Sequence, residues 1–109
     1  MRRMKLEKWR VETPEGEKEE SILDMISALV RMQRPEKIPK GIEKFQVFGR
    51  IAKAFDEALK TETLSLEESE YAFIREIMEK DIPSVWALNQ NYRKTVDAFL
   101  KLPEEEVKP

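Results

Sequence analysis

The sequence predicts an all-α protein, either a four-helix bundle or an orthogonal helical domain, with an extended N-terminal arm. Apolar residues recur at intervals of three and four along four segments, and Pro, Gly or Ser marks the links between those segments. The 109 residues are enough for one hydrophobic core. We therefore expect an arm over residues 1–12, a helical domain over residues 13–102 and a charged tail over residues 103–109.

The arm is strongly basic. Residues 1–11 contain five basic side chains and one acidic side chain. Met4 and Leu6 alternate with polar residues, as in an edge strand or an irregular segment clamped to a neighbour. The arm packs either on its own helices or on another subunit. The residues expected to contact a partner are Arg2, Arg3, Lys5, Lys8, Trp9 and Arg10.

The helical domain should begin after a turn over residues 13–16, which contains a Pro and a Gly. Helices are expected over residues 18–33, 42–61, 66–80 and 84–102. Ser65 and Glu68 have the spacing of a capping box for the third helix, and Ser84 is placed to cap the fourth.

The helix from Ile42 to Leu59 is expected to organise the core. Phe45, Phe48 and Phe55 share one face of it, and three aromatic rings are costly to leave in water. Phe48 and Phe55 are therefore predicted core residues. Gly49 lies on the same side, where it either permits close approach of another helix or is a tolerated weak point.

Composition excludes several kinds of chemistry. The chain has no histidine and no cysteine, so it lacks the commonest general base, the usual zinc ligands and a thiol nucleophile. The three glycines are isolated, so no phosphate-binding loop is present. We expect no enzymatic activity, no cofactor, and no catalytic or metal-binding residue.

Pairs of acidic residues one helical turn apart leave a magnesium-dependent hydrolase as the least favoured alternative. Such helical enzymes combine Glu-x-x-Glu with Glu-x-x-Asp, and this chain has no Glu-x-x-Asp. The pairs are interpreted as solvated helix faces. They are Glu17 with Glu20, Glu67 with Glu70, and Glu76 with Glu79.

The net charge of −2 is distributed in alternating basic and acidic blocks. Such blocks either pair helices within the fold, pair subunits, or form solvated faces. The basic arm around Trp9 supports an alternative function, a small nucleic-acid-binding regulator. No apolar run is long enough to span a membrane and no signal peptide is evident, so a cytoplasmic protein is expected.

The segment from Leu64 to Tyr71, continuing to Ile74 and Ile77, resembles a turn-plus-helix passage in small helical proteins of tailed-phage genomes. The resemblance implies an accessory or virion-assembly role in the host cytoplasm or the virion, without a catalytic residue. Together with the composition, it favours a non-enzymatic protein that binds a protein partner or its own copies.

Overall fold

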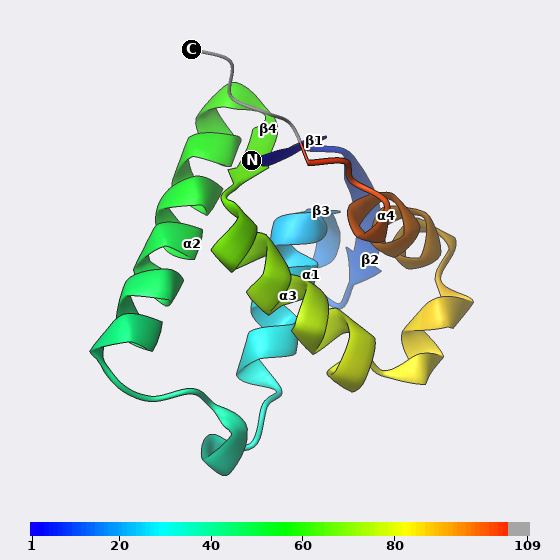
Figure 1. The fold of residues 1–109 in the computed structure, drawn as a ribbon. Coiled ribbons are helices and arrows are strands. Elements are labelled where there is room, and N and C mark those ends of the chain that lie inside the picture. Colours follow the sequence, from blue (N-terminus) through cyan, green and yellow to red (C-terminus); the bar gives the residue numbers. More distant parts are fainter. Residues whose placement is uncertain (105–109) are drawn as a thin grey trace.

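The computed structural model describes residues 1–104, except for the side chain of Pro35, and has a mixed α/β fold (Figure 1). Two antiparallel two-stranded sheets accompany the helices. The prediction of an all-α helical bundle is therefore wrong. The strands are β1 (Arg2–Lys5), β2 (Lys8–Thr13), β3 (Gly16–Ser21) and β4 (Thr63–Leu66). The helices are α1 (Ile22–Arg31), α2 (Ile42–Thr61), α3 (Glu68–Asp81) and α4 (Gln90–Leu100), with short 3-10 helices η1 (Pro35–Lys37) and η2 (Ser84–Leu88).

Strands β2 and β3 form a hairpin with a two-residue loop. The turn predicted over residues 13–16 is confirmed, and Gly16 has a φ of 117° that favours glycine. The segment after the turn is a strand, although it was predicted to begin the first helix. It contains no apolar residue before α1, so it has no stripe to bury as a helix. As a strand it places Glu19 opposite Arg10.

Strand β1 pairs with β4, so the start of the chain lies beside the segment that joins α2 to α3. That segment was predicted to be a turn followed by a capping box. Leu64 and Leu66 instead alternate with half-buried polar residues and point into the core, which is the period of a strand. Ser65 is therefore not a cap, because α3 begins at Glu68.

The caps of α1 and α4 also differ from expectation. Ser21 caps α1, because its Oγ accepts a hydrogen bond from the Leu23 N–H at 3.2 Å. Asp24 completes a capping box by accepting the Ser21 N–H at 2.8 Å. Asn89 caps α4 by accepting two N–H groups of its first turn. Ser84 instead begins the 3-10 helix η2 and makes no capping bond.

The core lies between α1, α3 and β4, not around α2. Half of α1 is buried, whereas α2 buries only Ile51 and Ala58 among its 20 residues. Phe48 and Phe55 are only partly buried and Phe45 is exposed, so the predicted central role of α2 is wrong. In Figure 1, α2 lies at one edge, with α3 and β4 on one side of it. The apolar residues of α2 extend further around the helix than the part that α3 and β4 cover.

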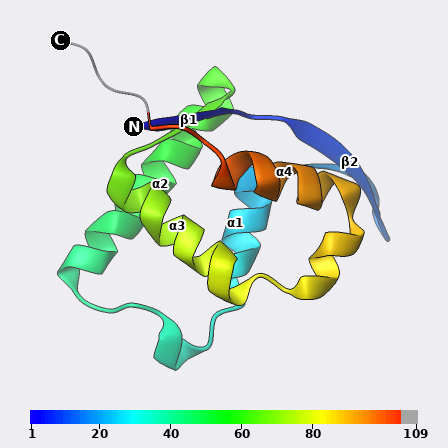
Figure 2. The ribbon, with the colours of Figure 1, turned by 45° about the vertical axis from the view of Figure 1, so that its right-hand side comes forward.

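Residues 1–12 lie within the body of the fold. Figure 2 shows β1 continuing into β2 along one side of the molecule, over α4. Leu6 between these strands is a core residue. The Nε atom of Arg2 donates to Glu68 at 2.8 Å, and its guanidinium lies 4.2 Å from the centre of the Tyr71 ring. Arg2 also donates to the carbonyl oxygen of Leu102. Of the tail predicted over residues 103–109, residues 105–109 lie outside the described part.

Candidate functional site

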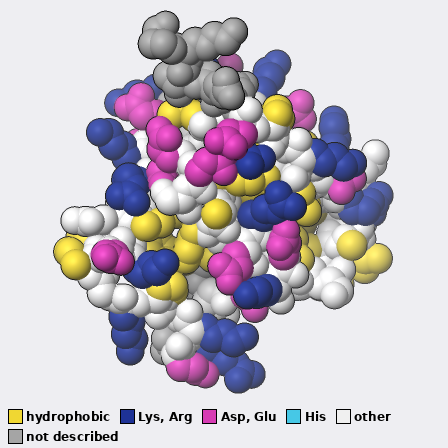
Figure 3. All heavy atoms as spheres, in the orientation of Figure 1, with side chains coloured by type: hydrophobic (Ala, Val, Ile, Leu, Met, Phe, Trp, Pro, Cys, Tyr) yellow, Lys and Arg dark blue, Asp and Glu magenta, His cyan; other side chains and the backbone are white. Residues whose placement is uncertain are grey.

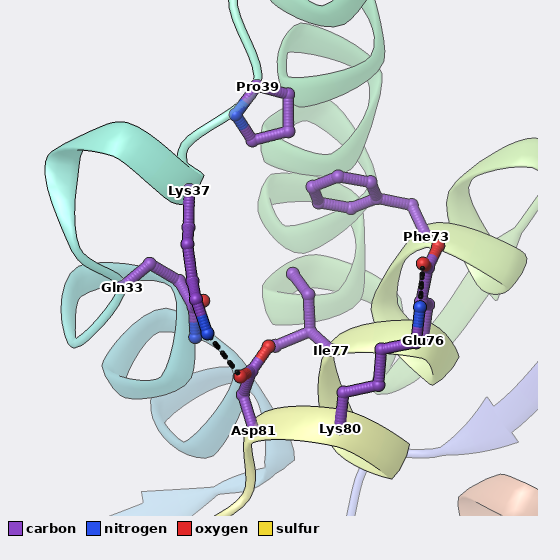
Figure 4. Close-up of a pocket in the computed structure, with 8 residues that line it drawn as sticks. All are labelled: Gln33, Lys37, Pro39, Phe73, Glu76, Ile77, Lys80 and Asp81. Atoms are coloured by element: carbon purple, nitrogen blue, oxygen red, sulfur yellow. Dashed lines mark hydrogen bonds and ion pairs between the residues drawn. The ribbon is translucent and has the colours of Figure 1, made fainter.

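A hollow of about 410 Å³ lies between η1 and α3. Figure 4 shows Phe73 and Ile77 of α3 on one side of it and Pro39 across from them. The rim carries two ion pairs, one between Lys37 and Asp81 at 3.7 Å and one between Lys80 and Glu76 at 2.7 Å (Figure 4).

This cavity offers little for catalysis or for binding a charged ligand. Each rim cation has a carboxylate beside it, so the rim has no net charge. The hydrogen bond from Lys80 lowers the pKa of Glu76, which keeps this carboxylate ionised instead of making it a proton donor. The Lys80–Glu76 pair is exposed, and the Lys37–Asp81 pair is long and partly exposed, so both contribute little energy.

The stronger candidate is an exposed set of side chains on α2. Ile42 is 68% exposed, Phe45 73% and Leu59 64%, and Ala52 between them is also exposed. Their spacing places them along one side of the helix. We call these four residues the apolar face of α2. In Figure 3, hydrophobic side chains reach the surface over the lower part of α2.

The apolar face of α2 is continuous with a groove between α1 and α2. This groove has a volume of about 270 Å³. Phe48 and Phe55 stand on its α2 side, next to Ala52, and Val30 and Arg31 on its α1 side. Three isoleucines of the core and Ser27 form its remaining lining, so the exposed face and the groove make one mainly apolar surface.

A smaller apolar patch lies on η2. Val85 is 64% exposed and Leu88 83%, and Figure 3 shows hydrophobic side chains at the matching edge of the molecule. A second cavity of about 270 Å³ adjoins it, lined by Trp86 and Tyr92 among others. The 3-10 helix has only five residues, so this patch is short compared with the face of α2.

The predicted partner-binding residues of the N-terminus do not form one basic surface. Lys5 and Lys8 are exposed, but they belong to different strands and different sheets. Arg2 is held by Glu68, and Arg10 donates to Glu17 at 2.8 Å. Arg3, on β1, is also exposed. The basic side chains of β2 lie against the acidic strand β3.

The Trp9 side chain makes contacts within the fold. Its Nε1 donates to Glu20 at 3.3 Å, and the hydroxyl of Tyr92 donates to the same carboxylate oxygen at 3.1 Å. The Trp9 and Tyr92 rings meet edge to face with centres 5.9 Å apart. Burial raises the pKa of Tyr92, and the charge of Glu20 raises it further. Trp9 therefore joins β2 to α4 rather than offering a free stacking surface.

The members of each predicted carboxylate pair do not converge on a common site. Glu76 binds Lys80 while Glu79 binds Arg75 at 2.7 Å. Glu70 is buried beside Arg50 at 3.4 Å, whereas Glu67 is exposed. Glu17 and Glu20 bind Arg10 and Trp9, as described above. Within the described part of the chain, no group of three potential ligands could hold a metal ion.

The apolar face of α2 was not predicted to be a surface, because the periodicity of its residues is also that of a core helix.

None of the helices in residues 1–104 is long and apolar enough to cross a membrane. Comparison with protein-family models, curated proteins and solved structures gives no match.

Proposed function

We propose that this protein is a non-enzymatic interaction or assembly protein that binds another protein through the apolar face of α2. The observation that carries the proposal is the exposure of Ile42, Phe45 and Leu59 along a 20-residue helix. Single exposed apolar residues are common, but a row that adjoins an apolar groove is typical of a binding surface.

The shape of this surface favours a helical partner. The helix α2 is about 30 Å long, and its apolar face extends over most of that length. An amphipathic helix that lies along such a face makes contacts at intervals of three and four residues. The residues of the face are three or seven apart, which is the same repeat with Gly49 and Asp56 at the intermediate positions.

The nucleic-acid alternative has less support. Binding to a phosphate backbone depends on several uncompensated cations on one surface. Here Arg2 and Arg10 have carboxylate partners, and β2 lies beside an acidic strand. Trp9 is packed on Tyr92 and bound to Glu20.

Photocrosslinking in the cells that make the protein tests the proposal. Phe45 is replaced by the photoreactive residue benzoylphenylalanine, and a matched variant carries the same group at Leu88. We expect a discrete adduct from position 45 that position 88 does not give. An added Ala52→Glu substitution on the same face should abolish it, because it places a charge in the apolar contact.

Two results would count against the proposal. One is the absence of any adduct at position 45 beyond those formed at position 88. The other is an adduct that persists with Ala52→Glu, since the contact would then not involve the apolar face of α2. Circular dichroism of each variant establishes that the fold is retained.

A further inference from the structure

We propose that the partner of the apolar face is a second copy of this chain, with the two α2 helices antiparallel across a two-fold axis. This inference rests on the proposed function and names the partner. It follows from the positions of the apolar and small residues along α2, and from the area that they expose.

The face is complementary to itself when one helix is reversed. With the axis beside the midpoint between Arg50 and Ile51, Ile42 of one copy lies level with Leu59 of the other. Gly49 lies level with Ala52 in the same way. Large apolar residues thus meet at the two ends and small residues meet at the centre, while Phe45 lies level with Asp56 of the other copy. A two-fold axis requires such self-complementarity in a dimer interface.

Gly49 supports close approach of the two helices. A glycine in a helix interior costs about 1 kcal/mol relative to alanine. Gly49 is exposed, and no neighbouring atom lies within 4 Å of the position that its Cβ would take. Packing inside this fold therefore does not require glycine here. Next to Ala52, it leaves space outside the molecule for another helix backbone.

The three large exposed side chains supply about half of the area of a standard dimer contact. At 73% exposure, Phe45 leaves on the order of 150 Å² accessible to water. With Ile42 and Leu59 the total reaches roughly 400 Å² per copy, about half of the ~800 Å² per partner in a standard interface. The walls of the groove, including the partly buried Phe48 and Phe55, contribute to the remainder.

One polar residue, Asp56, interrupts the face, and the reversed pairing places it level with Phe45 of the second copy. Gln46 follows Phe45 by one residue, and the side chains of Asp56 and Gln46 are both exposed in the monomer. The amide of Gln46 can donate to the Asp56 carboxylate, which avoids an unpaired charge in the contact. Two-fold symmetry forms this pair twice.

Molar mass in solution is the first test. Light scattering and sedimentation from about 1 to 200 μM should show the 12.9 kDa monomer converting to a species of twice that mass. Phe45→Glu should weaken association at least about tenfold. Leu88→Glu is the control, because it adds the same charge at an exposed position on η2 and should leave association unchanged.

Gly49→Leu separates association from folding. In the monomer, leucine has open space and a higher helix propensity, so the thermal midpoint at low concentration should rise. The same side chain blocks close approach and should weaken association at least about tenfold. If Gly49→Leu associates as tightly as the unchanged protein, the proposed contact is wrong.

The orientation is tested by disulfide formation, since the natural chain has no cysteine. Ile42→Cys and Leu59→Cys proteins are mixed and oxidised. Antiparallel pairing predicts a disulfide between the two variants, whereas parallel pairing predicts a disulfide of each variant with itself. Monomers throughout the concentration range, or dimers with parallel disulfides, overturn the inference. A photocrosslink from position 45 to a different protein, with monomers in solution, overturns the inference but leaves the proposed function standing.

Discussion

Replacing Phe99 by alanine is expected to cost far more stability than replacing Phe45. Phe99 is fully buried, and its ring lies 4.8 Å from that of Tyr71. A buried Phe→Ala substitution costs about 3–5 kcal/mol, a large share of the ~5–15 kcal/mol that stabilises a typical domain. Phe45 is 73% exposed, so Phe45→Ala should cost the monomer less than about 0.5 kcal/mol.

Urea unfolding followed by far-UV circular dichroism measures both substitutions. Protein is kept near 1 μM so that association does not contribute. With a urea dependence of about 1.5 kcal/mol per molar, Phe99→Ala should lower the midpoint by about 2–3 M, and Phe45→Ala by less than about 0.4 M. Phe99→Leu gives a milder cavity if the alanine variant is already unfolded in water. A loss above about 2 kcal/mol for Phe45→Ala, or below about 1 kcal/mol for Phe99→Ala, would refute the assignment of the core.

Three further predictions concern the ends of elements and the N-terminal strand. Ser21→Ala should lower the unfolding free energy by about 1 kcal/mol and Ser84→Ala by less than about 0.5 kcal/mol in urea titrations, and equal losses would contradict the assigned cap. The hydrogen bond from Arg2 lowers the pKa of Glu68 below its ordinary value of 4.5, so its stabilisation is present above that value and is lost as the pH falls through the folded-state pKa. In melting curves, Glu68→Gln should therefore reduce the loss of stability below about pH 5, and an unchanged acid profile would argue against this contact. Deleting residues 1–5 should lower the melting temperature and admit protease cleavage near β4, and a truncated protein with an unchanged melting temperature would show that β1 does not support the fold.

Sequence periodicity located the helices better than the strands. The helix over residues 42–61 matches the structure, because its apolar stripe is long and its flanks carry Gly41 and a polar turn. The segments that form β3 and β4 are short, and their partner strands lie at different distances along the sequence. β3 is paired locally, across a two-residue loop, whereas β4 pairs with the start of the chain. No local pattern reveals the second kind of pairing.

The candidate site was not predictable from sequence for a related reason. Spacing shows which residues share a face of α2, but not whether this chain covers that face. Ile51 and Ala58 are covered by the fold, while Phe45, on the adjoining arc, is not. The basic N-terminus was predicted to bind a partner because its charge is concentrated in sequence. In three dimensions, carboxylates such as Glu68 and Glu17 lie beside those cations.

The pairing of β1 with β4 fixes an order of events during synthesis. The hairpin of β2 and β3 involves neighbours in the chain and can close as soon as residue 21 is free of the ribosome. Arg2 meets Leu66 only after some sixty further residues have been made, which at about 5–20 residues per second takes several seconds. Strand β1 is thus unable to pair with β4 until α1 and α2 have been synthesised after it. In that interval, the backbone groups of β1 and the side chain of Leu6 have no native partner, so the nascent chain is most open to mispairing at β1.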